Sequence, residues 1–409
     1  MRTTIGDHLR KLRTESTLTQ ERLAERAGVS VETIRKLEQN ERTSARMSTL
    51  NRLATALGVP TTALMGSAAQ AQAMREPDAE PLGLVDVRRA LTPVSGLDGR
   101  SVIGDPETDP PTAADVRRSI LTANTIYHAN DYAAALGLIP GLLDEARALV
   151  GLTDGDEQLA AHALASRAHQ LAGRLLIQLR RLDLAHVALA SALDHARRSG
   201  DQMVGAAAVA PMCWLLLRQA RFAEAEALAV RTADQVEPRL STASPAELAA
   251  WGFLLMKGAS AAVRDARHAD ARDMLDLAAA RAHRLGDRPS PDADITGNDY
   301  SAEGVHLMRV EAAVIADRPD EALALAQQVP QSPQVTPSSR QRHRLDVAHS
   351  HVQTGAYADA TGVLMDLRER APAWLRQQRY ARDIVQSITE KRRRAMTAEL
   401  AELTSLVGA

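Results

Sequence analysis

The stretch TQERLAERAGVSVETIRKLEQ, residues 19–39, decides the fold of the N-terminal part of the chain. Its apolar residues recur at helical spacing on both sides of Gly28-Val29-Ser30, which predicts two short helices joined by a tight turn. Thr19 and Ser30 stand where the two helices start, and a hydroxyl there can accept a hydrogen bond from a free backbone N–H. We therefore expect one helix from Thr19 to Ala27 and a second over residues 31–39.

Residues 1–66 form a compact set of five short predicted helices around these two. Ala24 leaves room for the two helices to cross closely, and Val29 fills the corner between them. Val31, Glu32, Arg35 and Lys36 are left on the outward face. The expected core consists of Ile5, Leu9, Leu12, Leu23, Ile34, Leu37, Leu53 and Leu57.

The charge of the chain is divided unevenly. Its 49 Lys and Arg and 51 Asp and Glu give 409 residues a net charge of −2, yet residues 1–66 hold 11 basic and 7 acidic residues, a net of +4. Only this N-terminal part is electrostatically suited to nucleic acid. Four lysines against 45 arginines, with abundant alanine, are typical of a high-GC bacterial genome.

Four phrases occur in the order typical of one family: Leu18-Thr19-Gln20-x-x-Leu23-Ala24, Gly28-Val29-Ser30, Thr33-Ile34-x-x-Leu37-Glu38, and Thr49-Leu50-x-x-Leu53-Ala54-x-Ala56-Leu57-Gly58-Val59. Residues 4–66 thereby resemble the Xre, or Cro/repressor-type, helix-turn-helix family. The resemblance makes residues 31–39 the recognition helix that enters the major groove of DNA. It also pairs Arg13 with Glu38. The family's usual Gly after this helix is Asn40, which tolerates a left-handed backbone.

The resemblance assigns DNA contacts position by position. Val31, Glu32 and Lys36 would face bases, since Val31 can touch a thymine methyl, Glu32 can accept from cytosine N4 and Lys36 can donate to guanine. The full set of expected DNA-binding residues is Gln20, Ser30, Val31, Glu32, Thr33, Arg35, Lys36, Arg42 and Arg46. Within it Gln20, Arg35, Arg42 and Arg46 would hold phosphates. The loop from Asn40 to Met47 is about one residue longer than the family's usual loop, which leaves the roles of Arg42 and Arg46 open.

A linker and a repeat region follow. Residues 67–112 are rich in Pro, Gly, Asp and Ser, which is typical of a linker, although the amphipathic piece from Leu84 to Leu91 is also compatible with a short docked helix. From residue 113 to 409 the pattern is helical, and a phrase ending in a small residue recurs at helix junctions. Its alanines, at spacings of 50, 40, 46, 51 and 38, are Ala135, Ala185, Ala225, Ala271, Ala322 and Ala360.

Each repeat is expected to be an antiparallel helix pair in which the alanine lets the second helix approach the first. Over residues 113–390 the pattern resembles degenerate tetratricopeptide repeats, with HEAT-like or generic helical repeats as the alternative. The predicted fold class is all-α: a five-helix helix-turn-helix domain, then a right-handed superhelix of tetratricopeptide-like pairs. Ser244 and Glu247 form a predicted capping box at one helix start.

Other chemistry is not indicated. Cys213 is the only cysteine and is expected to be a buried apolar residue, as are most of the three tryptophans. No phosphate-binding loop, nucleophile elbow or zinc motif is present, so we expect neither an enzyme nor a cofactor or metal site. No apolar run is long enough to cross a bilayer, which together with the missing signal peptide predicts a cytoplasmic protein without membrane contact.

A helix-turn-helix domain followed by such repeats is similar to the peptide-sensing RRNPP regulators of Gram-positive bacteria and to long-repeat regulators of high-GC bacteria. The resemblance implies a homodimer on an inverted-repeat operator in double-stranded DNA, controlled, as in quorum sensing, by a peptide or protein on the concave face of the repeats. Candidate ligand-binding residues are the polar ones within predicted first helices: Asn124, His128, His169, Gln178, Arg218, Lys257, Asn298, His306, Arg309 and Asp346. The alternative is an interaction scaffold that recruits a partner protein while DNA binding is weak or constitutive.

Overall fold

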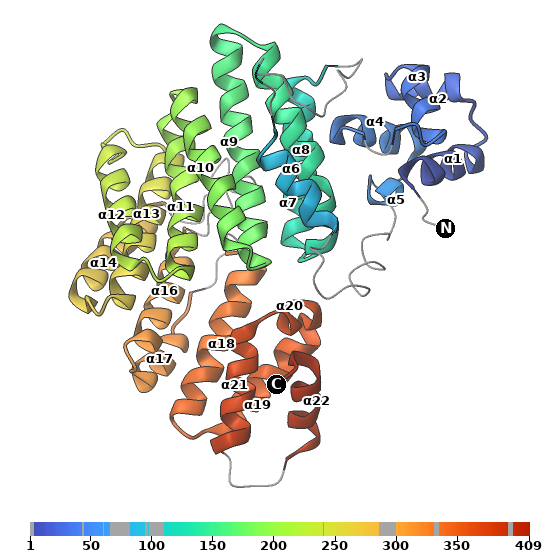
Figure 1. Ribbon diagram of the computed structural model, residues 1–409. Helices are drawn as coiled ribbons and strands as arrows, with labels where there is room; N and C mark the ends of the chain where they lie inside the picture. Colours follow the sequence, from blue (N-terminus) through green and yellow to red (C-terminus); the bar gives the residue numbers. More distant parts are fainter. Residues whose placement is uncertain are drawn as a thin grey trace. The chain divides into compact units, whose positions relative to one another are not determined.

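The computed structural model describes residues 4–42, 45–59, 61–65, 82–94, 97, 110–239, 241–285, 300–330, 335–391 and 396–409. Over these ranges the regular secondary structure is helical and no strand occurs, which confirms the all-α fold class (Figure 1). The chain divides into two compact units, Met1–Pro211 and Met212–Ala409. Each unit is described by itself.

The first unit begins with the five predicted short helices. They are α1 (Ile5–Glu15), α2 (Gln20–Ala27), α3 (Val31–Glu38), α4 (Met47–Leu57) and α5 (Thr61–Met65). Their shared core contains the expected leucines and Ile34, with Ile5, Leu12 and Leu57 packed against it and partly buried. At Gly6 an added Cβ would lie on the carbonyl of Leu37, so α1 and α3 approach more closely than any side chain at Gly6 would allow.

Longer helices complete the first unit. They are α6 (Leu82–Leu91), α7 (Ala113–His128), α8 (Tyr132–Leu152), α9 (Gly155–Gln178), α10 (Leu182–Ser199) and the start of α11 (Gln202–Arg218). Helix α6 lies within the predicted linker, as the alternative interpretation of residues 84–91 required. It packs on α8 with Leu84, Val87, Ala90 and Leu91 buried. The other described linker residues, 92–94, 97 and 110–112, form no helix, and the rest of 67–112 lies outside the described residues.

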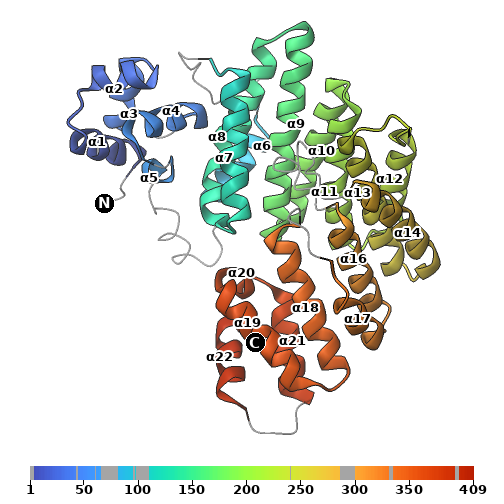
Figure 2. The same ribbon diagram turned by 180° about the vertical axis from the view of Figure 1, so that it is seen from behind.

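The second unit holds the remaining helices. They are α12 (Phe222–Gln235), α13 (Pro245–Arg264), α14 (His268–Leu285), α16 (Ala302–Ile315), α17 (Pro319–Ala326), α18 (Pro337–Gln353), α19 (Tyr357–Arg370), α20 (Pro372–Arg376), α21 (Arg379–Lys391) and α22 (Ala398–Val407). Ser244 and Glu247 form the expected capping box at the start of α13. Figure 2 shows α18, α19, α21 and α22 side by side, and their apolar faces share one core that includes Trp374.

The helix junctions repeat one backbone geometry. Within the described residues, six junctions contain a residue with φ between 57° and 78°, two positions before the second helix: Asn130, Arg180, Ala220, Ala266, Asp317 and Gly355. The next N–H then bonds to the carbonyl five residues earlier, as from Arg181 to Leu176 at 2.8 Å, which is the Schellman pattern. The six predicted alanines follow at the third position after each helix start, and each is at most 2% exposed. The six alanines are therefore buried, as the predicted close approach of the paired helices requires.

Candidate nucleic-acid interface

The turn between α2 and α3 is built by capping. The Oγ1 of Thr19 accepts from the N–H of Arg22 at 3.2 Å, and the Oγ of Ser30 accepts from the N–H of Thr33 at 3.2 Å. Gly28 ends α2 with φ +62°, a left-handed conformation that glycine adopts without a steric cost. The predicted helix, tight turn and second helix are therefore confirmed.

A buried carboxylate fixes α3 against α1 and α2. Both oxygens of Glu38 are bound by Arg13, at 2.6 Å from Nε and 2.9 Å from Nη2, and the Nε2 of Gln20 donates to the same group at 2.7 Å. Burial alone would raise the pKa of Glu38, but the hydrogen bonds from Arg13 and Gln20 and the charges of Arg13 and Arg10 outweigh it, so the pKa is lowered. The ion pair implied by the family resemblance is therefore present.

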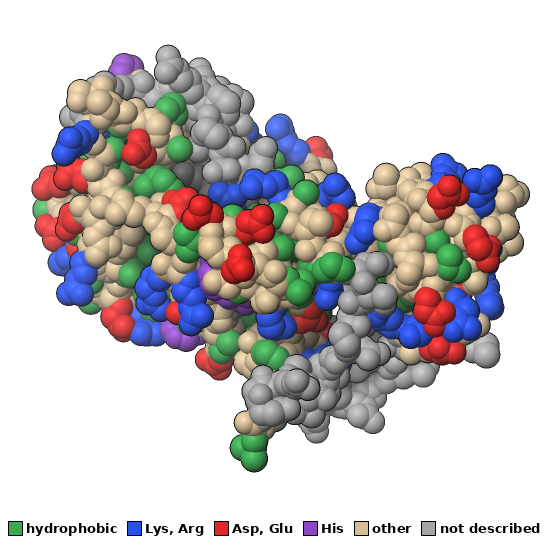
Figure 3. Space-filling view, turned by 90° about the horizontal axis from the view of Figure 1, so that it is seen from above, with side chains coloured by type: hydrophobic (Ala, Val, Ile, Leu, Met, Phe, Trp, Pro, Cys, Tyr) green, Lys and Arg blue, Asp and Glu red, His purple; other side chains and the backbone are tan. Residues whose placement is uncertain are grey.

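The outward face of α3 is exposed. Val31 is 39% exposed, and the side chains of Arg35 and Lys36 are 49% and 46% exposed. Glu32 lies between the two cations, 2.7 Å from Arg35 and 3.8 Å from Lys36, and Arg35 lowers its pKa. Figure 3 shows Lys and Arg side chains interspersed with Asp and Glu over this domain, at the right of the view. The face therefore offers both donors and an acceptor to base edges.

The other expected DNA contacts have structural roles in the free chain. The Gln20 amide donates to Glu38, and the hydroxyls of Ser30 and Thr33 lie 2.8 Å apart at the start of α3. Arg42 donates its backbone N–H to the carbonyl of Lys36 at 3.1 Å, and Arg46 is the N-cap residue of α4. Their contacts with DNA remain predictions. Asn40 has φ +59°, as expected for the residue that replaces glycine.

The comparison with known proteins agrees with this geometry. Residues 9–64 match the model of a helix-turn-helix family. The N-terminal part of the chain is a helix-turn-helix domain of the kind that binds DNA in transcription regulators. Among curated proteins, none is similar enough to the chain to be matched.

In the first unit, the expected ligand-binding residues are mostly engaged inside the helix layers. Asn124 is 5% exposed and accepts from Arg174 at 2.9 Å, and His128 packs edge-on against the neighbouring Tyr127 ring. His169 is buried and bonds to the carbonyl of Ala165 at 2.8 Å. Gln178 ends α9 and is half-buried. Whether any of them meets a ligand remains a prediction.

His169 belongs to a cluster of three histidine rings on α9 and α10 that the sequence did not reveal. His195 of α10 lies with its ring 5.1 Å from those of both His162 and His169. Burial lowers the pKa of His169 and of His195 to about 4, so both imidazoles are neutral at physiological pH. His195 is separated from the other two by a helix junction, so no spacing within one helix could have indicated it.

In the second unit, the expected ligand-binding residues divide between two environments. His306 bonds to the carbonyl of Leu325 at 2.8 Å, and Arg309 pairs with Asp276 at 2.5 Å, so both are bound to second helices. Arg218 lies over Trp214, and Lys257 lies 4.5 Å above the ring of Phe253. Asp346 is 2% exposed. Asn298 lies outside the described residues.

Asp346 belongs to a charged cluster across the first helices α13, α16, α18 and α21. Arg264 binds Glu311 at 2.7 Å, and Arg342 lies 4.0 Å from Glu311 and 3.6 Å from Asp346. Arg342 also stacks 4.3 Å above the ring of Tyr380. Burial raises the pKa of Asp346 to about 7 despite Arg342. The unusually polar sequence of α18, PSSRQRHRLDVAHSHVQ, is the signal that could have indicated this cluster.

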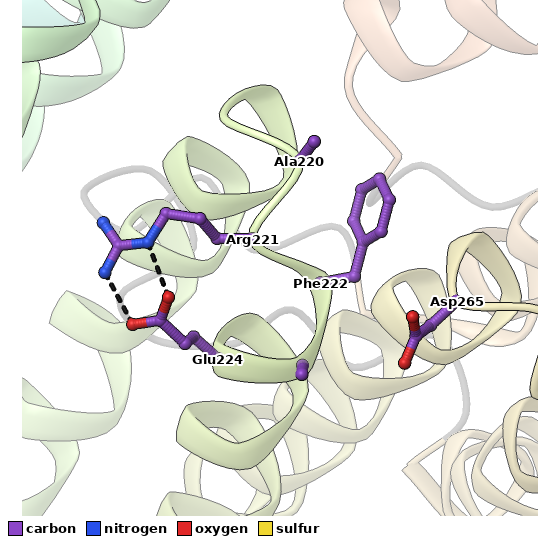
Figure 4. A pocket seen from close by; sticks show the side chains of 6 residues that line it. Ala220, Arg221, Phe222, Glu224 and Asp265 are labelled. Carbon is purple, nitrogen blue, oxygen red and sulfur yellow. Dashed lines mark hydrogen bonds and ion pairs between the residues drawn. The ribbon is translucent and has the colours of Figure 1, made fainter.

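A shallow depression lies at the junction of α11 and α12. Figure 4 shows its lining residues, among them Phe222, Asp265 and the Arg221–Glu224 ion pair, whose two N–O distances are 2.7 and 2.6 Å. None of the expected ligand-binding residues lines it. Over the described residues no group of three metal-ligating side chains is close enough to hold an ion, and no helix combines the length and apolar character that a membrane crossing needs.

Proposed function

We propose that the protein is a sequence-specific, dimeric transcription regulator that binds an inverted-repeat operator. The observation that carries the proposal is the exposed outward face of α3, where the acceptor Glu32 lies between the donors Arg35 and Lys36, beside the exposed Val31. One module contacts only one half-site, so useful affinity requires a second module about one helical turn of DNA away. That the protein is a dimer and that it is related to the Xre family are both parts of this proposal.

We further infer that a peptide or protein ligand controls the regulator through the tetratricopeptide-like helix pairs. The charged cluster supports this, since Arg264, Glu311 and Arg342 place opposite charges on the first helices α13, α16 and α18, where the ends and polar groups of a peptide could bind. Lys257 lies earlier on α13. A ligand that moves a dimer from 1:99 to 99:1 between two arrangements must bind one of them about 10⁴-fold more tightly. Extended contact along several helices suits that requirement.

Selection of bound duplexes from a random library at about 0.15 M salt tests DNA recognition, because salt strongly affects non-specific binding. An enriched inverted repeat is the expected result. Specific binding should exceed binding to random duplex by about 10³-fold or more. No enriched motif would contradict the regulator and favour the interaction scaffold.

Repeating the selection with extract of a producer culture tests ligand control. The extract is expected to change the occupancy or half-site spacing of the selected repeat. Lys257→Met should abolish this response while DNA binding is kept, because it removes the charge but retains the packing over Phe253. Lys391→Met, at an exposed position of α21, is the matched control. An inverted repeat that is indifferent to extract would contradict control by a diffusible ligand.

A further inference from the structure

Helix α4 of the helix-turn-helix domain begins without a capping side chain of its own. Its N-cap residue, Arg46, makes no side-chain hydrogen bond to the first turn, although the free N–H groups of a helix start need acceptors. The acceptor comes from α8, where the Oε1 of Glu145 accepts from the backbone N–H of Ser48. A carboxyl group from the repeat region therefore caps a helix of the DNA-binding domain.

The second oxygen of Glu145 extends this contact into a chain of hydrogen bonds. Ser119 of α7 donates to Oε2 at 3.0 Å and accepts from the Nδ2 of Asn51 at 3.4 Å. The Oδ1 of Asn51 then accepts from Thr61 at the start of α5, at 2.8 Å. Glu145, Ser119 and Asn51 are at most 4% exposed. A buried polar chain in which the partners satisfy one another favours one relative placement of the elements it joins.

Apolar and backbone contacts close the same interface. Met47, the first residue of α4, is 1% exposed. Across from it stands Gly141 of α8, where an added Cβ would lie 3.4 Å from the Met47 nitrogen and 3.6 Å from the Ala45 carbonyl oxygen. The backbone before α4 therefore packs directly on α8, and a large side chain at Gly141 would separate them.

A second anchor lies one half-turn further along α8. The Nη2 of Arg147 donates to the carbonyl of Ala90, in the last turn of α6, where a cation complements the helix dipole. Asp144 pairs with the same arginine at 2.6 Å. Helix α8 therefore binds both α4 and α6, which precede and follow residues 66–81 in the sequence. The two side chains that make these contacts, Glu145 and Arg147, are two positions apart on α8.

The contact leaves the recognition face accessible. Val31, Glu32 and Lys36 are exposed while α4 is bound to α8, so docking positions α3 without covering it. The contact also carries a cost, because burial raises the pKa of Glu145 to about 7 against the lowering by hydrogen bonds from Ser48 and Ser119 and by the Arg46 charge. The hydrogen bonds therefore offset only part of the cost of removing this carboxyl from water.

We propose that α7 and α8 form a docking surface for the DNA-binding domain of the same chain, with Glu145 as the positioning residue, and that docking sets the orientation of α3 and hence the half-site spacing. This inference rests on the proposed DNA-binding function for its consequence, but the docking itself can be measured without DNA. A movement of α8 relative to α7 would displace both contacts at once, that of Glu145 with Ser48 and that of Arg147 with Ala90.

Electron spin distance measurements on the full chain test the docking. Spin labels are placed at Arg22→Cys and Leu159→Cys, two exposed positions, in a Cys213→Ala background. The unmodified interface should give one narrow distance distribution. Glu145→Arg, which places a cation at the positive end of α4, should broaden it. Glu145→Gln keeps an acceptor and should leave it narrow, as should the control Glu157→Arg on the exposed start of α9.

Gly141→Leu provides an independent route to the same result, because it acts by steric separation at Met47 and leaves Glu145 in place. Circular dichroism checks that each variant keeps its helices. In duplex selection, Glu145→Arg and Gly141→Leu should relax the preferred half-site spacing while the half-site sequence stays the same. An unchanged distance distribution in both variants would overturn the docking. Broadened distances with an unchanged spacing preference would overturn its role in DNA recognition. If the unmodified protein enriched no duplex sequence, that result would instead contradict the proposed function.

Discussion

Arg13 on α1 and Glu38 on α3 form a bidentate ion pair in which the arginine side chain is 16% exposed and the carboxylate is fully buried. The same arginine donates from Nη1 to the carbonyl of Leu18 at 2.7 Å, just before α2. One side chain therefore connects the first helix, the start of the second and the end of the recognition helix. The orientation of α3 depends on this connection.

Replacing Arg13 should destabilise the DNA-binding domain, because a buried carboxylate would lose its main partner. Arg13→Ala is expected to lower the free energy of opening of α3 by about 3 kcal/mol, the low end for a broken buried pair, since Gln20 remains bound. Amide hydrogen exchange in the full chain measures this. Arg10→Ala is the control, because Arg10 is 61% exposed and 3.9 Å from the same group, and should cost less than about 1 kcal/mol. Equal effects of the two variants would contradict the assignment.

Acid should destabilise the same domain through Glu38. Its pKa in the folded chain is lowered from 4.5, so the ion pair stabilises the domain at pH values above 4.5. The stabilisation is lost as the pH falls through the lowered pKa, because the folded state must then take up a proton on a buried carboxylate. Hydrogen exchange of α3 between pH 3 and 6, about the range of carboxyl titration, tests this. Glu38→Gln should remove this part of the pH dependence, and an unchanged profile would contradict it.

The sequence predicts those features that depend on neighbouring residues. Thr19, Gly28 and Ser30 specify the turn within twelve positions, and the junction alanines reveal the helix pairs because the same local geometry recurs. Glu145 could not be predicted, since its partner Ser48 is 97 positions away and an acidic residue on a helix usually faces solvent. His195 escaped prediction for the same reason, because its partners His162 and His169 lie on another helix.

The repeated left-handed junctions predict a stabilising substitution. Ala266 has φ +60°, a conformation that costs a residue with a Cβ about 1–2 kcal/mol. Ala266→Gly removes that cost but adds chain entropy to the unfolded state, about 0.4–1 kcal/mol, so a net stabilisation of about 0.5 kcal/mol is expected. Urea denaturation measures it. Ala261→Gly, inside α13, should instead destabilise by about 1 kcal/mol. Destabilisation by Ala266→Gly would show that the junction is not strained.

Substitution by alanine should destabilise the chain at Gly252 and stabilise it at Gly362, both of which lie in helices. At Gly252 a Cβ would lie 2.1 Å from the ring of Tyr300, which is 2% exposed and donates to the Ala278 carbonyl at 2.6 Å. Overpacking there should cost about 1–3 kcal/mol. At Gly362, exposed on α19, nothing lies within 4 Å, so alanine should stabilise by about 0.5–1 kcal/mol. Urea denaturation distinguishes the two, and destabilisation by both would contradict the packing described at Gly362.

Replacing Lys36 distinguishes recognition of a base from non-specific attraction between the lysine charge and DNA. Its side chain is 46% exposed on the outward face of α3, where an amine can reach the O6 and N7 of guanine. Lys36→Ala should therefore weaken operator binding by about 1–3 kcal/mol and relax the base preference at one position of each half-site. Lys11→Ala is the matched control, because Lys11 is equally a surface lysine, on α1 beside Glu15. It should leave the base preference unchanged. Uniform weakening by Lys36→Ala on all sequences would instead place Lys36 at a phosphate, and the recognition of that base would then fall to Glu32 or Val31.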